Sequence, residues 1–359
     1  MAKKAKRSKG RDVRMFALKS QLEELKISHE RELRSIKAEL SEAQAQNSAV
    51  LERLDEQDKE LNAYAHALRK RRAPKSIKKR RAKGGATQST LVVLASDWHI
   101  EEIVEAKTLA DRGNAYSPEI ARARAERFFR KTVDLAEMCR KHTRVDDCVL
   151  ALLGDFITGH IHAELAETTA MAPLEAIDFA GDLLRAGITF LIDHGGFKRI
   201  IIPCCFGNHG RLTPKPYYGK AAVQNLEWFM YSNLKRHFEG APVEFVVTES
   251  RYNEDVEVYG RRLRFHHGED LKYAGGLQGF YGRLYKLHLE KNQHRACYWT
   301  CVGHWHRAHT FRRIGMVNGS LIGDSPYGER FGSEKPMQVF GLIEADRGCT
   351  LTGPVFVED

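Results

Sequence analysis

The sequence predicts an α/β fold made of two sheets that pack face to face and are flanked by helices. Three apolar, β-rich runs lie at 91–96, 148–154 and 199–207. Long segments with a helical pattern, around 118–142 and 171–194, alternate with these runs. Buried parallel strands joined by crossover helices produce this alternation. The first half of the folded region is therefore expected to be a parallel sheet covered by helices.

After a further helical stretch near 219–238, the composition changes to shorter β-type runs. These runs read VEFVVT, DVEVYG, RRLRFHHG, YWTCVG, HTFRRIG, MVNGSLIG and MQVFGLIEA. Short strands with little chain between them favour antiparallel pairing. The sequence thus predicts a second, mainly antiparallel set of strands, and a folded domain that covers residues 90–359.

The composition is that of a globular protein with a packed core. The chain has 359 residues, of which 42% are hydrophobic and 29% charged. No run approaches the roughly 18 to 20 apolar residues that span a bilayer, and the basic amino terminus has no apolar stretch behind it. Seven cysteines without regular spacing fit reduced thiols better than a secreted disulfide framework. We therefore expect no membrane association and a location in a bacterial or phage-infected host cytoplasm.

Positive charge is concentrated in the first quarter of the chain. Residues 1–89 contain 24 Lys or Arg and 12 Asp or Glu, whereas residues 90–359 contain 33 and 35. The segment 69–83 holds ten basic residues and no acidic one, and two glycines follow it. Such a run can neutralise phosphates, so residues 69–89 are interpreted as a basic flexible linker, and nucleic acid, specifically DNA, as the partner. The alternative is a solvated charged segment that binds nothing specific.

Residues 1–68 are expected to form a basic amino terminus followed by a coiled-coil helix. From Leu33 to Leu68, apolar residues recur with alternating spacings of three and four and occupy nine of eleven seam positions. This heptad pattern indicates a coiled coil, in which the polar Asn47 and Gln57 would restrict the register. We therefore predict a homo-oligomer that assembles through this helix. The alternative is a single amphipathic helix that lies on the main domain.

Polar residues of metal-ligand type follow five of the β-rich runs. They stand in the motifs Asp97-Trp98-His99, Gly154-Asp155, Gly207-Asn208-His209, His267-Gly268 and Gly303-His304-Trp305-His306. Sheets of α/β proteins place ligands at the carboxyl ends of their strands, so these side chains are expected to meet at one edge. Carboxylate, imidazole and amide ligands without a thiolate suit Mn²⁺, with Fe or Zn²⁺ as alternatives. Two such ions can polarise a phosphoryl group and generate a hydroxide, which predicts a dinuclear hydrolase.

With these five motifs, roughly residues 90 to 345 resemble the calcineurin-like metallophosphoesterases. The resemblance implies two metal sites that share one bridging carboxylate. The implied ligands are Asp97, His99 and His306 for one metal, Asn208, His267 and His304 for the other, and Asp155 between them. The resemblance also implies that His209 is the catalytic residue, which protonates the leaving oxygen or stabilises the transition state.

Two departures from the family pattern concern the surroundings of His209. Gly210 and then Arg211 follow the G-N-H motif, where the family commonly has an acidic residue. Thr158 stands where the protein phosphatases of the family carry an Asp, so the chain is not expected to belong to that branch. Arg211 is interpreted as a phosphate-binding residue, and His162 as a second substrate-binding residue close to the bridging position.

Three functions are compatible with the sequence. The leading one is a metal-dependent phosphodiesterase that acts on nucleic acid, a DNA nuclease, because the site supplies the chemistry and the basic segment can hold a polyanion. The second is a phosphoesterase for small nucleotides or other phosphate esters, favoured by the near-neutral charge of residues 90–359. The third is a non-catalytic DNA-binding or assembly protein, disfavoured because every ligand position is filled. The segment 154–167 is also similar to phosphoesterases encoded by bacteriophages and their hosts.

Overall fold

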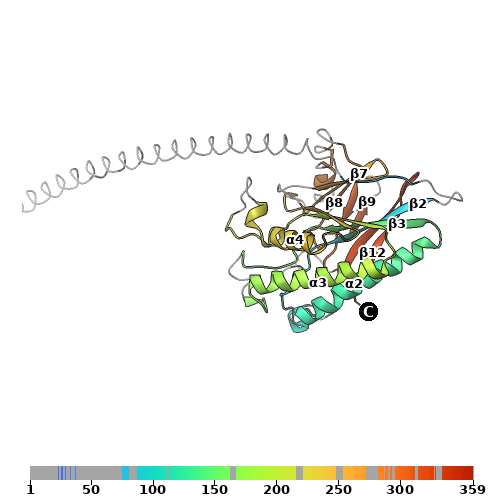
Figure 1. The fold of residues 1–359 in the computed structure, drawn as a ribbon. Coiled ribbons are helices and arrows are strands. Elements are labelled where there is room, and N and C mark those ends of the chain that lie inside the picture. The colour runs from blue at the N-terminus through green and yellow to red at the C-terminus, as the bar shows by residue number, and fades with distance from the viewer. Residues whose placement is uncertain are drawn as a thin grey trace, which may run out of the picture. The chain divides into compact units, whose positions relative to one another are not determined.

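The computed structural model describes most of the folded region and little of the amino-terminal region. The described residues are 23, 26, 29, 33, 37, 75–80, 87–110, 113–161, 167–215, 221–247, 254–271, 282–286, 288, 289, 292, 296–311, 314–326, 328 and 334–358. Contacts within the chain divide it into two units, Met1–Arg69 and Lys70–Asp359. All the described strands belong to the second unit (Figure 1).

The first sheet has six strands in the order β12-β11-β2-β3-β4-β5. Its strands are β2 (Gln88–Ala95), β3 (Arg144–Leu152), β4 (Arg199–Cys204), β5 (Val243–Val247), β11 (Met337–Glu344) and β12 (Gly348–Phe356). Strands β2 to β5 run parallel, and β11 and β12 add an antiparallel edge. Because β2, β3 and β4 are buried along almost their whole length, each carries an uninterrupted apolar run instead of an alternating pattern, after a polar start in β2 and β3.

Three long helices pack on one face of this sheet (Figure 1). They are α2 (Pro118–Arg140), α3 (Pro173–His194) and α4 (Leu226–His237), and two short 3-10 turns, η1 (Ala106–Thr108) and η3 (Ala222–Gln224), lie in the connections. Helix α2 begins where the Ser117 side chain accepts the backbone N–H of Ile120. The apolar sides of the helices and the outward residues of the sheet form one core. Trp98 lies in this core against three phenylalanine rings.

The second sheet packs on the other face of the first and has the order β1-β6-β7-β8-β10-β9. Its strands are β1 (Lys75–Ile77), β6 (Glu254–Val258), β7 (Arg261–His266), β8 (Trp299–Val302), β9 (His309–Phe311) and β10 (Gly315–Val317). The core between the sheets includes Val92 and Leu94 of β2 and Leu263, Phe265 and Trp299 of the second sheet. The predicted sandwich of two sheets flanked by helices is therefore confirmed. All seven cysteines are free thiols, in agreement with their irregular spacing.

The prediction that the later strands pair mainly antiparallel is wrong at three places. Strand β5 is parallel to β4, β7 is parallel to β8, and β8 is parallel to β10. Parallel neighbours need a long crossover connection. Helix α4 supplies it between β4 and β5, and residues 267–298 supply it between β7 and β8. Short strand length alone therefore did not decide the pairing.

The interpretation of residues 69–89 as a flexible linker is wrong for the part that the structure describes. Residues Lys75–Ile77 form β1, which pairs in parallel with β6 at the edge of the second sheet. Ile77 is fully buried between the sheets. The Arg80 guanidinium donates to Asp147 at 2.8 Å, and its backbone N–H donates to the Gln88 side chain at 2.8 Å. One apolar side chain and nearby carboxylates are sufficient to order this basic segment.

The predicted coiled coil lies almost entirely outside the described residues. Glu23, Lys26, His29, Leu33 and Lys37 are helical and exposed. Assembly through this helix stays a prediction. Among the described residues, no helix has both the length and the apolar composition needed to cross a membrane.

The burial of Ile77 gives a direct test of strand β1. Ile77→Ala should lower the free energy of unfolding by about 2–5 kcal/mol, because it leaves a cavity between the sheets. Lys78→Ala, at the exposed neighbouring position, should change it by less than about 0.5 kcal/mol. Urea unfolding followed by fluorescence of the buried tryptophans measures both. Equal midpoints for the two variants and the parent would show that the segment is a linker after all.

Candidate metal centre

Six predicted ligands form two clusters beyond the carboxyl ends of the strands. One cluster consists of Asp97, His99 and His306, and the other consists of Asp155, His267 and His304. Within each cluster, one ligand atom from every residue lies within 4.8 Å of the others. The loops that carry these residues follow β2, β3, β7 and β8, so both sheets contribute. The structure thus brings six of the seven predicted ligands together in two groups and places Asp155 in the second.

In the first cluster, two ring nitrogens face each other across a short gap. Nε2 of His99 is 3.2 Å from Nε2 of His306, which is 3.5 Å from Oδ1 of Asp97. Both carboxylate oxygens of Asp97 lie 3.0 Å from the backbone nitrogen of His304, whose N–H they accept. The opposite side of the His99 ring is held because Nδ1 lies 3.1 Å from the Thr158 hydroxyl. The ligand atoms are therefore directed to a common point.

His267 stands at the centre of the second cluster. Its Nε2 is 2.9 Å from Oδ2 of Asp155, 3.1 Å from Nδ1 of His304 and 3.1 Å from Oδ1 of Asn208. Its Nδ1–H donates to the backbone carbonyl of Leu153 at 2.7 Å, which leaves Nε2 as the ligand atom. Asn208 therefore adds its amide oxygen to this cluster.

In each cluster, the pKa of one histidine is lowered and that of another is raised. Burial and the charges of His209 and His306 lower the pKa of His99 well below its usual value. Burial and the charge of His267 lower the pKa of His304 to about 3. Burial also acts on His267 and His306, but their carboxylate neighbours outweigh it and raise both pKa values. The raised pKa values show that positive charge is favoured where imidazole and carboxylate lone pairs converge, and a divalent cation fits the same position.

Both carboxylates carry a negative charge into this buried site. Burial alone would raise the pKa of Asp97, but the hydrogen bond and charge of His306 together with the charge of His267 outweigh burial and lower that pKa. For Asp155, burial is likewise outweighed by the combined effect of His267, His209 and His99, and the pKa lies well below its usual value. Carboxylates that stay ionised inside a buried site require cations beside them, either protonated imidazoles or metal ions. The residues therefore fit two divalent ions.

Backbone strain is concentrated at the predicted ligands. Six described non-glycine residues have a positive φ, and five of them belong to the clusters. These five are Asp97, His99, Asp155, His304 and His306, with φ between 47 and 70°. A left-handed conformation costs such residues roughly 1–2 kcal/mol each and persists where the surrounding structure enforces it, often at functional sites. The fold therefore holds the ligand loops in place before any ion binds.

Gly154 and Gly207 allow two ligand loops to approach backbone to backbone. Gly154 has a φ of +91°, and a Cβ added there would lie 2.2 Å from the Gly207 nitrogen. A Cβ added at Gly207 would lie 2.0 Å from Oδ1 of Asp155. No side chain fits at either position. The glycines of the G-D and G-N-H motifs are thus required by this contact.

Glu227, in the first turn of α4, ties these two loops together. Its buried carboxylate accepts the Gly207 N–H with one oxygen at 2.6 Å and the Phe156 N–H with the other at 2.7 Å. Asn225, the N-cap of α4, donates to the Gly207 carbonyl at 2.8 Å. Burial raises the pKa of Glu227 to about 8, the charge of Asp155 adds to this, and the two N–H groups oppose it. Glu227 is a positioning residue for the second cluster.

A second buried carboxylate, Glu101, supports the loop after Asp155. Its Oε1 accepts the backbone N–H groups of Thr158 and Gly159, both at 2.8 Å. Burial raises the pKa of Glu101 to about 7. Neither Glu101 nor Glu227 was predicted. The only sequence signal for Glu227 is its place after an N-cap residue at a helix start, which indicates helix initiation and not a loop contact.

The structure identifies the group that orients His209. Its Nδ1–H donates to the backbone carbonyl of Thr158 at 2.7 Å, and its backbone N–H donates to Oδ1 of Asp155 at 2.9 Å. A main-chain carbonyl therefore does what the family pattern assigns to a carboxylate. The ring lies edge-on to His99, with 4.9 Å between ring centroids. Nε2 of His209 is left to exchange a proton next to the clusters.

The two predicted substrate-binding residues have different outcomes. The Arg211 guanidinium donates to the backbone carbonyls of Asn208 at 3.0 Å and Thr213 at 3.1 Å, so it fixes the loop that carries Asn208. Its contact with a phosphate stays a prediction. His162 lies outside the described residues.

Known proteins with solved structures offer weak matches, and no family model or curated protein matches the chain. A single mutant of Vps29 from Entamoeba histolytica is 12% identical over 74% of this chain and 98% of that chain, with a TM-score of 0.29. Wild-type Vps29 of the same organism, complexed with Zn²⁺, is 11% identical over 74% and 99%, with a TM-score of 0.29. A predicted phosphoesterase from Streptococcus pneumoniae is 10% identical over 75% and 98%, with a TM-score of 0.26. The likeness to calcineurin-like metallophosphoesterases is at the level of the superfamily and rests on the five motifs and the two clusters.

The role of Glu227 can be tested by removing its two hydrogen bonds. Glu227→Ala should lower the free energy of unfolding by about 2–5 kcal/mol and reduce metal retained after dialysis, because two backbone N–H groups lose their acceptor. Glu227→Gln keeps one acceptor and should give a smaller loss of both. Glu239→Ala, at an exposed position just beyond the same helix, is the control. If Glu227→Ala keeps its metal and stability, Glu227 does not position the loops.

Proposed function

We propose that this chain is a metal-dependent phosphodiesterase that hydrolyses nucleic acid. The observation that carries the proposal is the pair of carboxylate–imidazole clusters, whose ligand atoms converge on two points beyond the strand ends. Their ligands include no thiolate, so they suit catalytic divalent ions, Mn²⁺ first and Fe or Zn²⁺ as alternatives. The fold and the five motifs are those of metallophosphoesterases.

The residues of the centre have separate roles in hydrolysis, as metal ligands or as a proton donor. When bound, two divalent ions would polarise the phosphoryl group and supply a hydroxide at neutral pH. His99 and His304 have lowered pKa values and therefore offer lone pairs as ligands. Asp155, with one oxygen on His267 and the other on the backbone of His209, ties the catalytic histidine to the ligands. His209 then donates the proton on Nε2 to the leaving oxygen.

Nucleic acid is the proposed substrate because of the distribution of charge. The segment 69–83 contains ten cations and no acid, which is enough to hold several backbone phosphates. The small-phosphate alternative is supported by the charge of residues 90–359, where 33 basic and 35 acidic residues nearly balance. A non-catalytic role is less well supported, since all seven ligand positions are occupied by side chains that can bind a metal.

A panel of substrates separates these functions. Purified protein with Mn²⁺ is incubated with single-stranded DNA, duplex DNA, RNA, mononucleotides and bis-p-nitrophenyl phosphate in parallel. The proposal expects cleavage of a nucleic acid at a kcat/KM at least about a hundredfold above that for mononucleotides. Hydrolysis of only the small esters would favour the small-phosphate enzyme, and no hydrolysis with any of Mn²⁺, Fe²⁺ or Zn²⁺ would favour the non-catalytic role.

Substitutions of His209 and Asp155 should affect kcat and metal content differently. His209→Ala should keep both metal ions and lower kcat by on the order of 10² to 10⁴-fold on DNA. The loss should be smaller on bis-p-nitrophenyl phosphate, because p-nitrophenolate needs little protonation to leave. Asp155→Asn should lose both turnover and metal, because its carboxylate contacts the second cluster and is the implied bridge. Metal analysis and kinetics on both substrates decide. Loss of metal in His209→Ala would make His209 a ligand, and equal losses on both substrates would remove it as the proton donor.

A further inference from the structure

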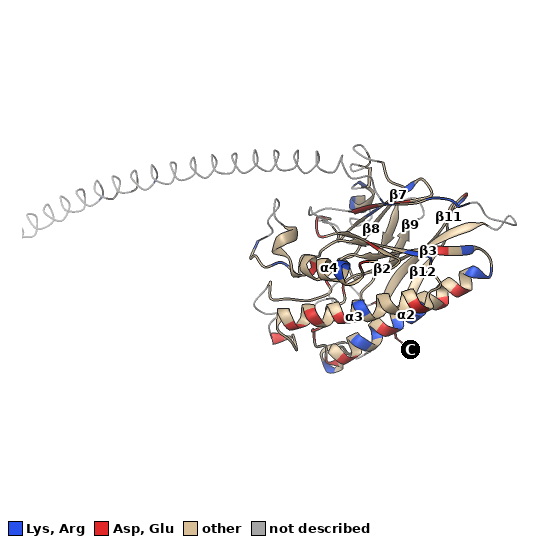
Figure 2. Cartoon of the chain, viewed as in Figure 1, with Lys and Arg blue, Asp and Glu red and all other residues tan. Residues whose placement is uncertain are grey.

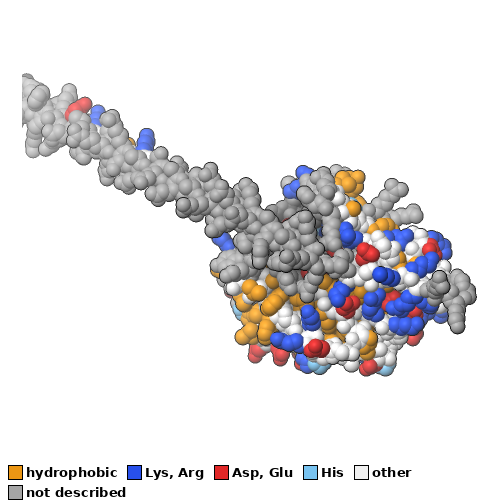
Figure 3. Space-filling model, turned by 45° about the horizontal axis from the view of Figure 1, so that its top comes forward, with side chains coloured by type: hydrophobic (Ala, Val, Ile, Leu, Met, Phe, Trp, Pro, Cys, Tyr) orange, Lys and Arg blue, Asp and Glu red, His pale blue; other side chains and the backbone are white. Residues whose placement is uncertain are grey.

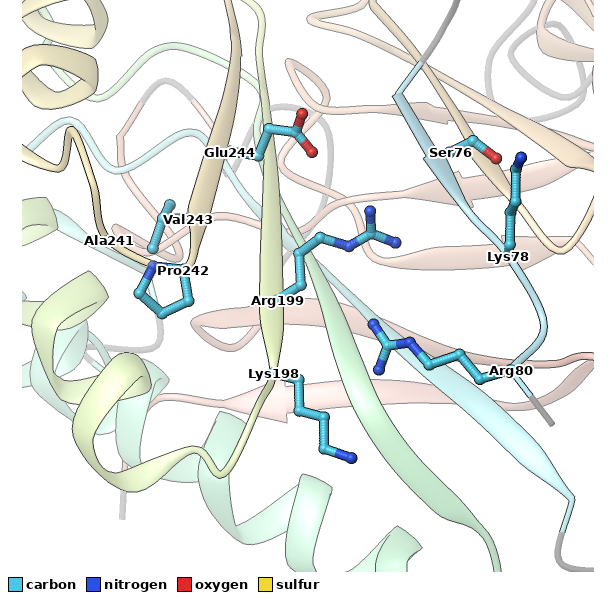
Figure 4. Close-up of a pocket in the computed structure, with 9 residues that line it drawn as sticks. All are labelled: Ser76, Lys78, Arg80, Lys198, Arg199, Ala241, Pro242, Val243 and Glu244. Carbon is cyan, nitrogen blue, oxygen red and sulfur yellow. The ribbon is translucent and has the colours of Figure 1, made fainter. Parts of the chain in front are cut away.

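A cavity of about 600 Å³ lies at the amino-terminal ends of β4 and β5. The metal clusters follow the carboxyl ends of the same parallel sheet, so one strand length, roughly 20 Å, separates the two sites. Figure 4 shows that the guanidinium groups of Arg80 and Arg199 point toward each other across the cavity. Ser76, Lys78 and Lys198 also line it. We refer to this cavity as the basic pocket.

Positive charge exceeds negative charge around the basic pocket. Six cations, Lys75, Lys78, Arg80, Arg144, Lys198 and Arg199, lie in or next to the pocket with four carboxylates, Asp146, Asp147, Glu244 and Glu257. Figure 2 marks Lys and Arg positions in blue at the neighbouring turn between α2 and β3, and Figure 3 shows many Lys and Arg side chains, with some Asp and Glu among them, on one side of the molecule. In a domain whose residues 90–359 are nearly neutral, this is a local concentration of positive charge.

Asp146 and Asp147 form ion pairs with Arg80 and Arg199, but these contacts do not use every N–H group of the two guanidinium groups. Asp147 is fully buried, with Arg80 at 2.8 Å and Arg199 at 3.7 Å. Nη1 of Arg80 and Nε of Arg199 are buried and face carboxylates, Asp146 at 3.5 Å and Asp147 at 3.7 Å. These ion pairs fix both guanidinium groups in advance. The rest of each side chain stays partly exposed, 37% for Arg80 and 29% for Arg199, so a fixed pair of guanidinium groups is accessible to the oxygens of a phosphate.

Ion pairing within the protein does not explain the whole pocket. A purely structural cluster needs only Arg80 and Arg199 to neutralise Asp147. Lys78 is exposed and has no ion pair among the described residues, and the side chain of Lys198 is 64% exposed although it lies 3.3 Å from Asp146. These lysines add donors beside the arginines, whereas the Ser76 hydroxyl donates to Glu257 at 3.3 Å. That is the arrangement of a binding site open to an anion.

We propose that the basic pocket binds a phosphate group, and that this phosphate belongs to the backbone of a nucleic acid held away from the metal centre. The choice of nucleic acid as the source rests on the proposed function, whereas the phosphate chemistry does not. Strand β1 belongs to the basic segment 69–83, and Ser76, Lys78 and Arg80 of this segment line the pocket. A free phosphate or mononucleotide presents the same group to the same donors.

The test removes charge without removing the arginines that stabilise Asp147. The variant Lys78→Gln with Lys198→Gln leaves Arg80 and Arg199 in place. The matched control is Lys131→Gln with Arg185→Gln, two exposed cations on α2 and α3. Binding to the full-length, metal-loaded chain is measured with a labelled duplex DNA whose phosphorothioate linkages resist hydrolysis, over a salt titration. Inorganic phosphate is titrated by calorimetry, and hydrolysis of bis-p-nitrophenyl phosphate reports on the metal centre.

If the proposal holds, the pocket variant lowers the salt slope of DNA binding by about 1.8 and weakens binding at least about tenfold near 0.1 M salt, since two phosphate contacts are lost. Phosphate binding weakens too, while ester hydrolysis and the control variant match the parent. Loss of phosphate binding with unchanged DNA binding would support the phosphate site and overturn nucleic acid as its source. Unchanged binding of both ligands would overturn the proposal, whatever the metal centre does.

A variant that is expected to strengthen binding controls for loss of binding caused by misfolding. Glu244 lines the pocket and forms an ion pair with Lys75. Glu244→Gln removes a negative charge from the pocket and frees Lys75, so it should strengthen the binding of both DNA and phosphate by at least about threefold. A Glu244→Gln protein that binds no better than the parent would contradict an anion site here.

Discussion

The metal centre depends on one close contact, the approach of the loop after β3 to the loop after β4. Gly154 and Gly207 permit this approach, because a Cβ on either would overlap with the other loop. The Glu227 carboxylate then accepts a backbone N–H from each loop, one on each oxygen. Asp155 and Asn208 reach His267 only because these loops are so close. Helix α4 is therefore a part of the centre, although none of its side chains is a predicted ligand.

Electrostatics and backbone strain oppose the folding of this region, and the same features favour cations in it. Two buried carboxylates and four imidazoles converge, and five of these six residues hold a left-handed backbone. Hydrogen bonds from the backbone, such as His304 N–H to Asp97 and His209 N–H to Asp155, satisfy part of the negative charge. The remaining negative charge raises the pKa values of His267 and His306 and favours a divalent cation at the same position. Metal binding would therefore offset part of the cost of assembling the site.

The sequence predicted those site residues whose type and spacing are restricted by metal binding or by backbone conformation. It did not predict residues whose role depends on a contact formed only in the tertiary structure. Ligand residues after apolar runs, and glycines beside them, indicated the clusters because metal geometry restricts residue type and spacing. Glu227 and Glu101 could not be found in this way, since an acceptor for backbone N–H groups has no fixed spacing to the donors. Strand β1 was missed because charge dominates its composition, and the single buried Ile77 orders it. The parallel pairing of β7, β8 and β10 depends on what lies between them, which strand length does not reveal.

The two edges of the parallel sheet have opposite electrostatic character, and at each edge buried carboxylates determine which charges lie beside them. At the carboxyl edge, the loops concentrate carboxylates and imidazoles for cations. At the amino edge, Asp146 and Asp147 begin β3, and the buried charge of Asp147 requires cations next to it. Arg80 and Arg199 meet that requirement, and both residues also line the basic pocket. A carboxylate buried for structural reasons therefore fixes two guanidinium groups, and fixed guanidinium groups need no further ordering to bind an anion. A polyanion held at this edge would remain attached whether or not a bond is being cut at the other, so retention and cleavage can be tuned separately.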